Sequence, residues 1–315
     1  MKRKRLSGLL LAVLAVCLTA GRGSADAEKS RVYMTKEINP SGLMAVYEAL
    51  DRQPSGRVAV KISTGEAGNP HYLSPDLIRD LVKRVDGTIV ECNTAYGGSR
   101  AATAMHRQVA RDHGFTAIAE VDIMDAGGEI ALPVAGGKNL KENYVGASFE
   151  KYDFYVVLSH FKGHAMGGFG GAIKNASIGI ASSGGKAWIH SAGKSKTNPW
   201  GGEQDPFLES MAEAAKSVSD RLGEGKRVLY INVMNHLSVD CDCDAAPAAP
   251  DMHDIGILAS LDPVALDQAC VELVYAASDG KSLIERMESR NAAHALAHGE
   301  AIGLGSRQYD MIRLN

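Results

Sequence analysis

The stretch FYVVLSHFKGHAMGGFGGAIKN, residues 154–175, starts as an apolar strand and continues as a loop rich in glycine and basic residues. The run 154–160 is apolar almost throughout, which is typical of a strand in a parallel sheet that is covered on both faces. The stretch also carries five glycines and four basic side chains, His160, Lys162, His164 and Lys174. Ligands of such sheets bind where the strands end, so we expect this loop to belong to the functional site.

Short apolar runs alternate with helical stretches on both sides of this segment. Strands are predicted at residues 57–63, 88–92, 227–235 and 255–261, and helices at residues 74–85, 99–115, 206–222 and 262–277. Ser74 and Asp262 are expected N-caps, because a proline follows each at the first helical position. The alternation predicts an α/β fold, Rossmann-like, in which a mostly parallel sheet carries helices on both faces. We expect a single domain over residues 28–315, and a two-lobed shape stays open.

Residues 1–27 have the pattern of a secretory signal peptide. A basic start, MKRKR, precedes an apolar run, and the small residues ADA end at Ala27. The apolar run is short for a membrane span, and Val16 is large for the position before a lipid-modified Cys17. We therefore expect an exported protein, periplasmic or extracellular, with no stable membrane span after cleavage. A retained signal anchor or a lipid anchor is the less favoured alternative.

Composition and charge narrow the choice of partners. The chain has 315 residues, 45% of them hydrophobic and 23% charged, and a formal charge of −3. Signal cleavage removes five basic residues and one acidic residue, which takes the charge to −7. Because nucleic-acid binding requires clustered basic residues, we expect no nucleic-acid partner. A small-molecule substrate is the expected ligand.

Four cysteines remain after such a cleavage, Cys92, Cys241, Cys243 and Cys270. Each lies at the carboxyl end of a predicted strand or one to two helical turns beyond it. The ordinary use of cysteine in an exported protein is the disulfide bond, and a C-x-C pair can form one. Four thiolates are also the ligands of a tetrahedral metal or an iron–sulfur cluster. The sequence leaves both uses open.

Polar side chains that follow the strands form a candidate anion site. Asn93, Tyr96 and Arg100 come after strand 88–92, and Lys162 and Asn175 lie in the glycine-rich segment. Arginine binds a carboxylate or phosphate through a bidentate fork, and lysine binds it as a point charge. Backbone amides of the glycines could add an anion-binding nest. These residues predict a small anionic substrate.

Five ordered motifs resemble the family known as domain of unknown function 362 over essentially the whole chain after residue 27. They are ECNTAYGGSR, SHFKGHAMGGFGGAIKNASIG, DCDCD, DIGILASLDPVALDQAC and GEAIGLGSRQYDMI. Many relatives are labelled iron–sulfur proteins, so the resemblance implies an iron–sulfur cluster or a transition metal at Cys92, Cys241, Cys243 and Cys270. This chain lacks the C-x-x-C-x-x-C insert that many of those relatives carry.

The segment from His164 to His190 also resembles, distantly, the signature of the lactate racemase family. A glycine-rich turn, GGFGG, follows His164; Lys174 lies ten residues after that histidine, and His190 lies sixteen residues after the lysine. The resemblance implies that His164 is an acid/base catalyst and His190 a metal ligand. It implies that Lys174 binds a cofactor or an anion, since the matching lysine tethers a nickel-pincer nucleotide in that family.

These features together predict an exported metal- or iron–sulfur-dependent oxidoreductase that acts on a small anionic substrate, with an electron-transfer protein as a further partner. The predicted catalytic residues are His164, His160 and Lys174, and His190 joins the cysteines at the metal. Redox chemistry is favoured over isomerisation because cysteine and histidine loops follow the same set of strands. Two alternatives stay open: a racemase- or isomerase-like enzyme, and a non-catalytic exported protein that binds a metal or an anion.

Overall fold

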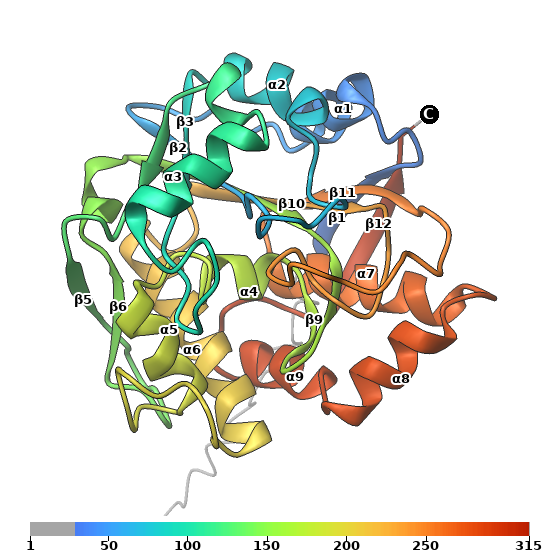
Figure 1. Cartoon of the computed structure of the whole chain (residues 1–315). Helices are drawn as coiled ribbons and strands as arrows, with labels where there is room; N and C mark the ends of the chain where they lie inside the picture. The colour runs from blue at the N-terminus through green and yellow to red at the C-terminus, as the bar shows by residue number, and fades with distance from the viewer. Residues whose placement is uncertain (1–28, 315) are drawn as a thin grey trace, which may run out of the picture.

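The computed structural model describes residues 29–314, and an eight-stranded sheet lies at its centre (Figure 1). In order across the sheet, the strands are β12 (Tyr309–Arg313), β1 (Ser30–Thr35), β11 (Gly256–Ser260), β10 (Val228–Met234), β7 (Phe154–His160), β2 (Val58–Lys61), β3 (Gly87–Glu91) and β4 (Val121–Ile123). The predicted signal peptide, residues 1–27, lies outside the described residues. Within residues 29–314, no helix is both long enough and apolar enough to cross a membrane.

Seven strands of this sheet run in one direction, and β11 alone runs against its neighbours. Parallel pairing joins β10 to β7, β7 to β2, β2 to β3, β3 to β4 and β1 to β12. β11 is antiparallel to both β10 and β1. The chain passes from β10 to β11 without a helix, whereas parallel neighbours are usually joined by a helical crossover. The predicted mostly parallel sheet is confirmed, with one reversed strand inside it.

Helices cover both faces of this sheet, as predicted. α1 (Pro40–Ala49) and α2 (Pro75–Arg84) lie above the sheet in Figure 1. α4 (Ala172–Ala176), α5 (Ser183–His190), α6 (Gln204–Arg221), α7 (Pro263–Ala276), α8 (Lys281–Ser289) and α9 (Ala293–Ala301) lie below it. Successive residues of the strands face the two layers in turn. In β7, Val156 packs in the upper core and Val157 in the lower core.

Smaller elements surround this sandwich. β5 (Glu129–Pro133) and β6 (Glu142–Gly146) form one antiparallel hairpin, and β8 (Lys162–His164) and β9 (Gly168–Gly170) form another directly after β7. α3 (Thr103–Asp112) lies beside β4 and is followed by the short helix η1 (Phe115–Ala117). A second short helix, η2 (Ala147–Lys151), leads into β7.

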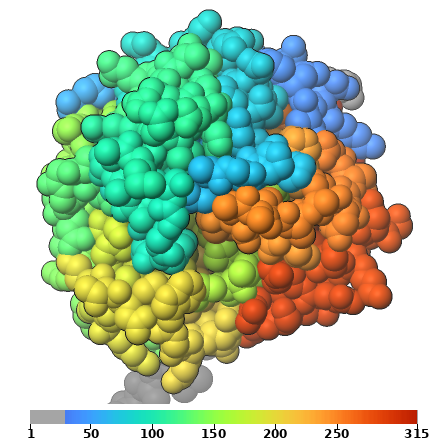
Figure 2. Space-filling view, viewed as in Figure 1, coloured from blue at the N-terminus to red at the C-terminus, as the bar shows by residue number. Residues whose placement is uncertain are grey.

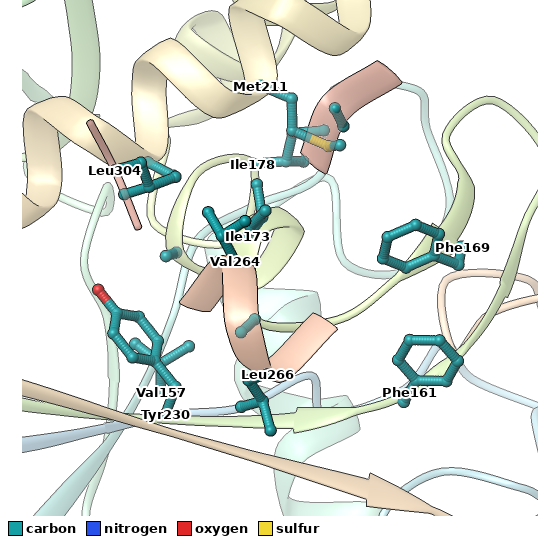
Figure 3. Packing of buried hydrophobic residues seen from close by; sticks show 14 of the residues in the cluster. Val157, Phe161, Phe169, Ile173, Ile178, Met211, Tyr230, Val264, Leu266 and Leu304 are labelled. Carbon is teal, nitrogen blue, oxygen red and sulfur yellow. The ribbon is translucent and has the colours of Figure 1, made fainter. Parts of the chain in front are cut away.

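Aromatic packing anchors the hairpin β8–β9 at the end of the sheet. The rings of Phe161 and Phe169 stack with centroids 5.4 Å apart (Figure 3). Both rings are buried in the same core as Val157 of β7 and Ile173 of α4. Because loss of a buried phenylalanine ring costs about 3–5 kcal/mol in a typical core, this packing fixes the hairpin in place.

All four predicted helices are observed, and their ends agree within two residues except those of α3, which ends at Asp112, three residues before the predicted end. Ser74 accepts a backbone hydrogen bond of 3.2 Å at the start of α2, and Asp262 accepts two, of 2.8 and 3.0 Å, at the start of α7. Both are therefore N-caps, as expected. α3 begins at Thr103, four residues later than predicted, since residues 99–102 form a turn instead. That turn places Arg100 among buried residues. The single domain over residues 28–315 stays a prediction.

Candidate functional site

The glycine-rich segment is an ordered hairpin and a short helix rather than an open loop. β8 pairs with β9 residue by residue, and α4 follows at once. Two amides at the start of α4 donate to the buried carboxylate of Asp267, at 2.7 and 2.9 Å. The Gly163 N–H donates to the Ser238 carbonyl, and the Gly167 N–H donates to Nδ1 of His164. These four amides have protein partners and are therefore not free to bind an anion.

The carboxyl ends of β2, β3 and β7 border a cavity of about 80 Å³, which we call the inner cavity. α4, α5 and the C-x-C segment form its other walls. Its charged lining consists of four cationic side chains and two carboxylates: Lys61, Arg100, Lys174 and Lys186, with Glu91 and Asp242. Excess positive charge in a small buried space attracts an anion. The cavity therefore has the charge that the predicted anionic substrate requires.

Glu91 is the centre of a buried ion network on one side of the inner cavity. It accepts hydrogen bonds from Lys61 Nζ at 3.1 Å, from Arg100 Nη1 at 3.0 Å and from the Thr64 N–H at 2.9 Å. Burial acts to raise the pKa of Glu91, but the two cations outweigh it and hold the pKa well below its usual range. Asn175 extends the network, because its Oδ1 accepts from Lys61 Nζ at 2.9 Å.

Lys174 is the cation of the inner cavity that lacks a partner. Among residues 29–314, no group forms a hydrogen bond or an ion pair with its Nζ. Burial lowers the pKa of Lys174 to about 8, and the charges of Lys61 and Arg100 act in the same direction. At neutral pH the side chain is therefore a charged donor without a counter-ion. An anion in the inner cavity would supply that counter-ion.

A second cavity of about 310 Å³, which we call the outer cavity, adjoins the inner one. Three residues line both cavities and form the wall between them: Tyr96, Cys241 and Cys243. His164 and His190 line the outer cavity, together with the apolar side chains of Met166 and Trp200. Figure 2 shows a hollow on this face, where segments coloured teal, yellow and orange meet. The two histidines of the predicted signature thus share one cavity.

His164, in β8, is held as a neutral imidazole with its hydrogen on Nε2. Its Nδ1 accepts from the Gly167 N–H at 2.8 Å and lies 3.3 Å from the Met166 N–H. Burial lowers the pKa of His164 well below its usual value, and the charge of Lys174 acts in the same direction. A neutral imidazole whose Nδ1 accepts carries its hydrogen on Nε2. His164 can therefore donate a hydrogen bond, and it has no free lone pair to accept a proton.

His190, at the end of α5, has the opposite arrangement. Its Nδ1 lies 2.7 Å from the Lys186 carbonyl oxygen and must donate to it. Its Nε2 is buried and has no hydrogen-bond partner within the described part of the chain. Burial lowers the pKa of His190 to about 4. The ring, which stacks on Phe207 with centroids 4.9 Å apart, therefore carries a free lone pair on Nε2.

The segment 240–244 forms the wall between the cavities together with Tyr96. Cys241 and Cys243 form a disulfide bond, and Asp242 between them is buried. The Asp242 carboxylate lies 3.0 and 3.1 Å from Nδ1 of His160, whose Nε2 lies 2.7 Å from a backbone carbonyl. Both nitrogens of His160 thus face acceptors, so neither is free for the proton transfer that its predicted catalytic role requires. His160 instead positions Asp242.

The cysteines and histidines do not fit a metal ion in this arrangement. The sulfur atoms of Cys241 and Cys243 and one nitrogen of His164 lie within 4.8 Å of one another. The sulfurs are bonded to each other, however, whereas a metal binds the thiolate. A histidine that binds a metal donates from its second ring nitrogen, and Nδ1 of His164 accepts instead. His190 does have the hydrogen bonding of a ligand, but it is not part of this group.

The other two predicted metal ligands lie apart from this group. Cys92 lines the inner cavity, but its Sγ lies 3.2 Å from the Ile180 carbonyl oxygen, and burial raises its pKa to about 12. Cys270 lines neither cavity and contacts Asn232 at 3.4 Å inside the lower core. The antiparallel direction of β11 explains this position. The carboxyl end of β11, where α7 starts, lies at the opposite end of the strands from the cavities. The structure therefore does not assemble the predicted four-cysteine site.

Three of the five predicted anion-binding residues line the inner cavity: Arg100, Tyr96 and Asn175. Asn93 instead donates to Thr103, and Lys162 lies behind Asp242, with its Nζ 3.7 Å from that carboxylate. Four charged residues of the cavity were not among the predicted site residues: Lys61, Glu91, Lys186 and Asp242. A signal was present for Lys61 and Glu91, because each is a charge inside an apolar strand segment, RVAVKIS or TIVEC.

The fold and the site define an α/β protein with a cationic cavity at its strand ends and a disulfide in the cavity wall. The chain belongs to the family described as domain of unknown function (DUF362), whose family model matches residues 58–272.

Among solved structures, the chain is similar to the lactate racemase apoprotein from Thermoanaerobacterium thermosaccharolyticum, at 14% identity and a TM-score of 0.43, over 77% of this chain and 56% of that one. It is also similar to a structural-genomics protein from Thermotoga maritima, at 12% identity and a TM-score of 0.40, over 83% of this chain and 58% of that one. The chain thus spans less than two thirds of either structure. No curated protein matches the sequence.

Proposed function

We propose that this protein is an isomerase that moves a proton at a carbon atom of a small anionic substrate. The opposite hydrogen bonding of His164 and His190 in the outer cavity carries the proposal. His190 offers a lone pair on Nε2, and His164 offers a hydrogen on Nε2. A base and a neutral hydrogen-bond donor are the two groups that proton abstraction next to a carbonyl requires.

The roles of the two histidines follow from these hydrogen bonds. Nε2 of His190 takes the proton from the carbon next to the substrate's carbonyl or carboxylate group and returns it to that carbon or to its neighbour. Nε2–H of His164 donates to the oxygen on which negative charge develops. His164 keeps its hydrogen throughout, because Nδ1 already accepts from the backbone.

The inner cavity supplies the anion-binding half of the site. Lys174 is the free cation there, and Arg100 and Lys61 add charge that is partly compensated by Glu91. A bound anion near the histidines favours their protonated forms and so raises their pKa values. Burial and the charge of Lys174 lower the pKa of His190, and a bound anionic substrate would raise it and so increase the basicity of Nε2.

Proton exchange with solvent tests this proposal. The protein is incubated in D₂O with L-lactate, L-malate and glycolate as probes, and loss of the carbon-bound proton is followed by ¹H NMR. We expect exchange with at least one probe, and we expect His190→Gln to abolish it. His253→Gln is the matched control, because His253 is exposed and pairs with Asp279. No exchange with any probe, or exchange that survives His190→Gln, would rule out the proposed reaction and leave the anion-binding alternative.

The predicted metal- or iron–sulfur-dependent oxidoreductase, with an electron-transfer partner, is the second candidate. It is supported by the proximity of His164, Cys241 and Cys243. Holding a metal there would require reduction of the disulfide and a new tautomer of His164. Metal analysis and ultraviolet–visible spectra of anaerobically purified protein test it: a stoichiometric metal favours this candidate, and its absence removes it.

We propose further that the protein is exported, to the periplasm or outside the cell. The leader pattern of residues 1–27 supports this proposal, and a disulfide suits an oxidising compartment. N-terminal sequencing of the protein from its native host tests it. We expect the mature chain to begin at Glu28, whereas an intact N-terminus would contradict export by cleavage.

A further inference from the structure

The Cys241–Cys243 disulfide has little to contribute as a structural bridge. The two residues are only two positions apart, and a bridge over so short a loop removes little freedom from the unfolded chain. The loop also has other anchors on both sides. The Asp242 carbonyl accepts from the Glu66 N–H at 2.7 Å, and Arg286 donates to the Val239 carbonyl at 2.7 Å.

The disulfide lies where a small molecule can reach it. Both cysteines are half-buried, and both line the inner and the outer cavity. The outer cavity is also lined by Trp200, which is 56% exposed, so this cavity opens to solvent. A small molecule that enters the outer cavity therefore reaches the sulfur atoms. Since hydrogen bonds hold the loop independently of the bridge, the two sulfurs stay close together after the bridge opens.

We propose that Cys241–Cys243 is a redox-active disulfide that exchanges two electrons with a small dithiol entering through the outer cavity. The proposal does not rest on the isomerase activity. One thiolate of the dithiol attacks a cysteine sulfur, the protein S–S bond breaks, and a mixed disulfide forms. The second thiolate of the dithiol then attacks that mixed disulfide. The dithiol leaves as a cyclic disulfide, having given two electrons and two protons to the two cysteines.

The hydrogen bonding of the pair indicates which sulfur is attacked. The Cys243 N–H lies 3.4 Å from Sγ of Cys241 and donates to it. A donor on a sulfur stabilises its thiolate, and the better-stabilised thiolate is the better leaving group. Cys241 therefore leaves, and the mixed disulfide forms on Cys243.

The two other cysteines among residues 29–314 do not compete for this exchange. Cys92 and Cys270 are 1% and 0% exposed, and neither lines the outer cavity through which the reagent enters. Burial also raises the pKa of both thiols, which keeps them protonated and unreactive. The redox chemistry of the described chain is thus confined to the C-x-C pair.

Differential alkylation of the folded protein tests the proposal. Protein that begins at Glu28, and therefore lacks Cys17, is purified in air and treated with iodoacetamide, either directly or after dithiothreitol, and the modified peptides are identified by mass spectrometry. We expect no alkylation before reduction, two modified residues, Cys241 and Cys243, after reduction, and modification of Cys92 and Cys270 only in urea. Addition of cystamine to the reduced protein should restore the bridge and protect both cysteines again.

Two outcomes would overturn the proposal: alkylation of the pair without a reductant, or a bridge that dithiothreitol opens only in urea. The double variant Cys241→Ser/Cys243→Ser is the control and should remain unmodified in the folded state. The attacked sulfur is identified by brief treatment with glutathione and an acid quench. Glutathione on Cys243 supports the assignment, and glutathione on Cys241 refutes it.

Discussion

Replacement of Glu91 by glutamine tests the ion network that shapes the inner cavity. The substitution keeps the size of the side chain and removes its charge. Whichever way the new amide turns, its NH₂ group meets a donor, either Lys61 Nζ at 3.1 Å or Arg100 Nη1 at 3.0 Å. Arg100 keeps a second carboxylate, Glu66, at 3.3 Å, whereas Lys61 has no other counter-ion among the described residues. The variant therefore leaves one buried cation unpaired.

Removal of one partner from a buried ion pair costs about 3–5 kcal/mol, and we expect Glu91→Gln to lower the free energy of unfolding by that amount. The assay is urea unfolding at pH 7, followed by the fluorescence of the two tryptophans. The matched control is Glu150→Gln, since Glu150 forms a half-exposed pair with Arg221 at 2.6 Å. Exposed pairs contribute about 0–1 kcal/mol.

A loss for Glu91→Gln no larger than that of Glu150→Gln would refute the network. The double variant Lys61→Met/Glu91→Gln separates the charge effect from loss of packing. If the unpaired cation is the main cost, the double variant loses less stability than the two single variants together, because neighbouring sites are not additive. A loss equal to the sum would show that Lys61 and Glu91 act independently.

Three further predictions concern Lys174, His190 and the disulfide. The pKa of Lys174 is about 8, and only its protonated form attracts an anion. The affinity for sulfate, measured by calorimetric titration, should therefore be constant below pH 8 and fall about tenfold per pH unit above it. The variant Lys174→Arg should not show this decrease. The pKa of His190 is about 4 when folded and 6.5 as an ordinary histidine. Stability should therefore be full above pH 6.5 and fall by up to about 3 kcal/mol as the pH drops toward 4, and urea unfolding at pH 4.5 and pH 7 should show a smaller difference for His190→Gln. The double variant Cys241→Ser/Cys243→Ser should change the free energy of unfolding by less than about 2 kcal/mol; a larger loss in the same assay would assign the bridge a structural role.

The sequence was sufficient to place the glycine-rich segment at the carboxyl end of a buried strand. It could do so because continuous apolar runs and N-caps such as Ser74 and Asp262 are local features. The direction of β11 is not determined by local sequence, since it depends on whether the connection from β10 contains a crossover helix. Because β11 is reversed, Cys270 lies away from the site, and the predicted four-cysteine site is not formed.

The roles of the histidines could not be predicted from their spacing. The spacing predicted that His164 and His190 act together, and both line one cavity. Their hydrogen-bond partners, however, decide which ring nitrogen is free. Those partners are backbone atoms, the Gly167 N–H and the Lys186 carbonyl. Any residue supplies such atoms, so the sequence carries no sign of them. The same holds for His160, whose two nitrogens are occupied by Asp242 and a carbonyl.

The cations of the inner cavity and the neutral histidines of the outer cavity form one electrostatic arrangement. Burial, together with the charge of Lys174, lowers the pKa of both His164 and His190 and keeps them uncharged at neutral pH. An anion bound at Lys174 cancels that charge and raises the pKa of His190. The base therefore gains affinity for a proton only when an anionic group is in place. Proton uptake on anion binding follows as the property that joins the two cavities, and it makes the free lone pair of His190 a base for bound substrate rather than for solvent.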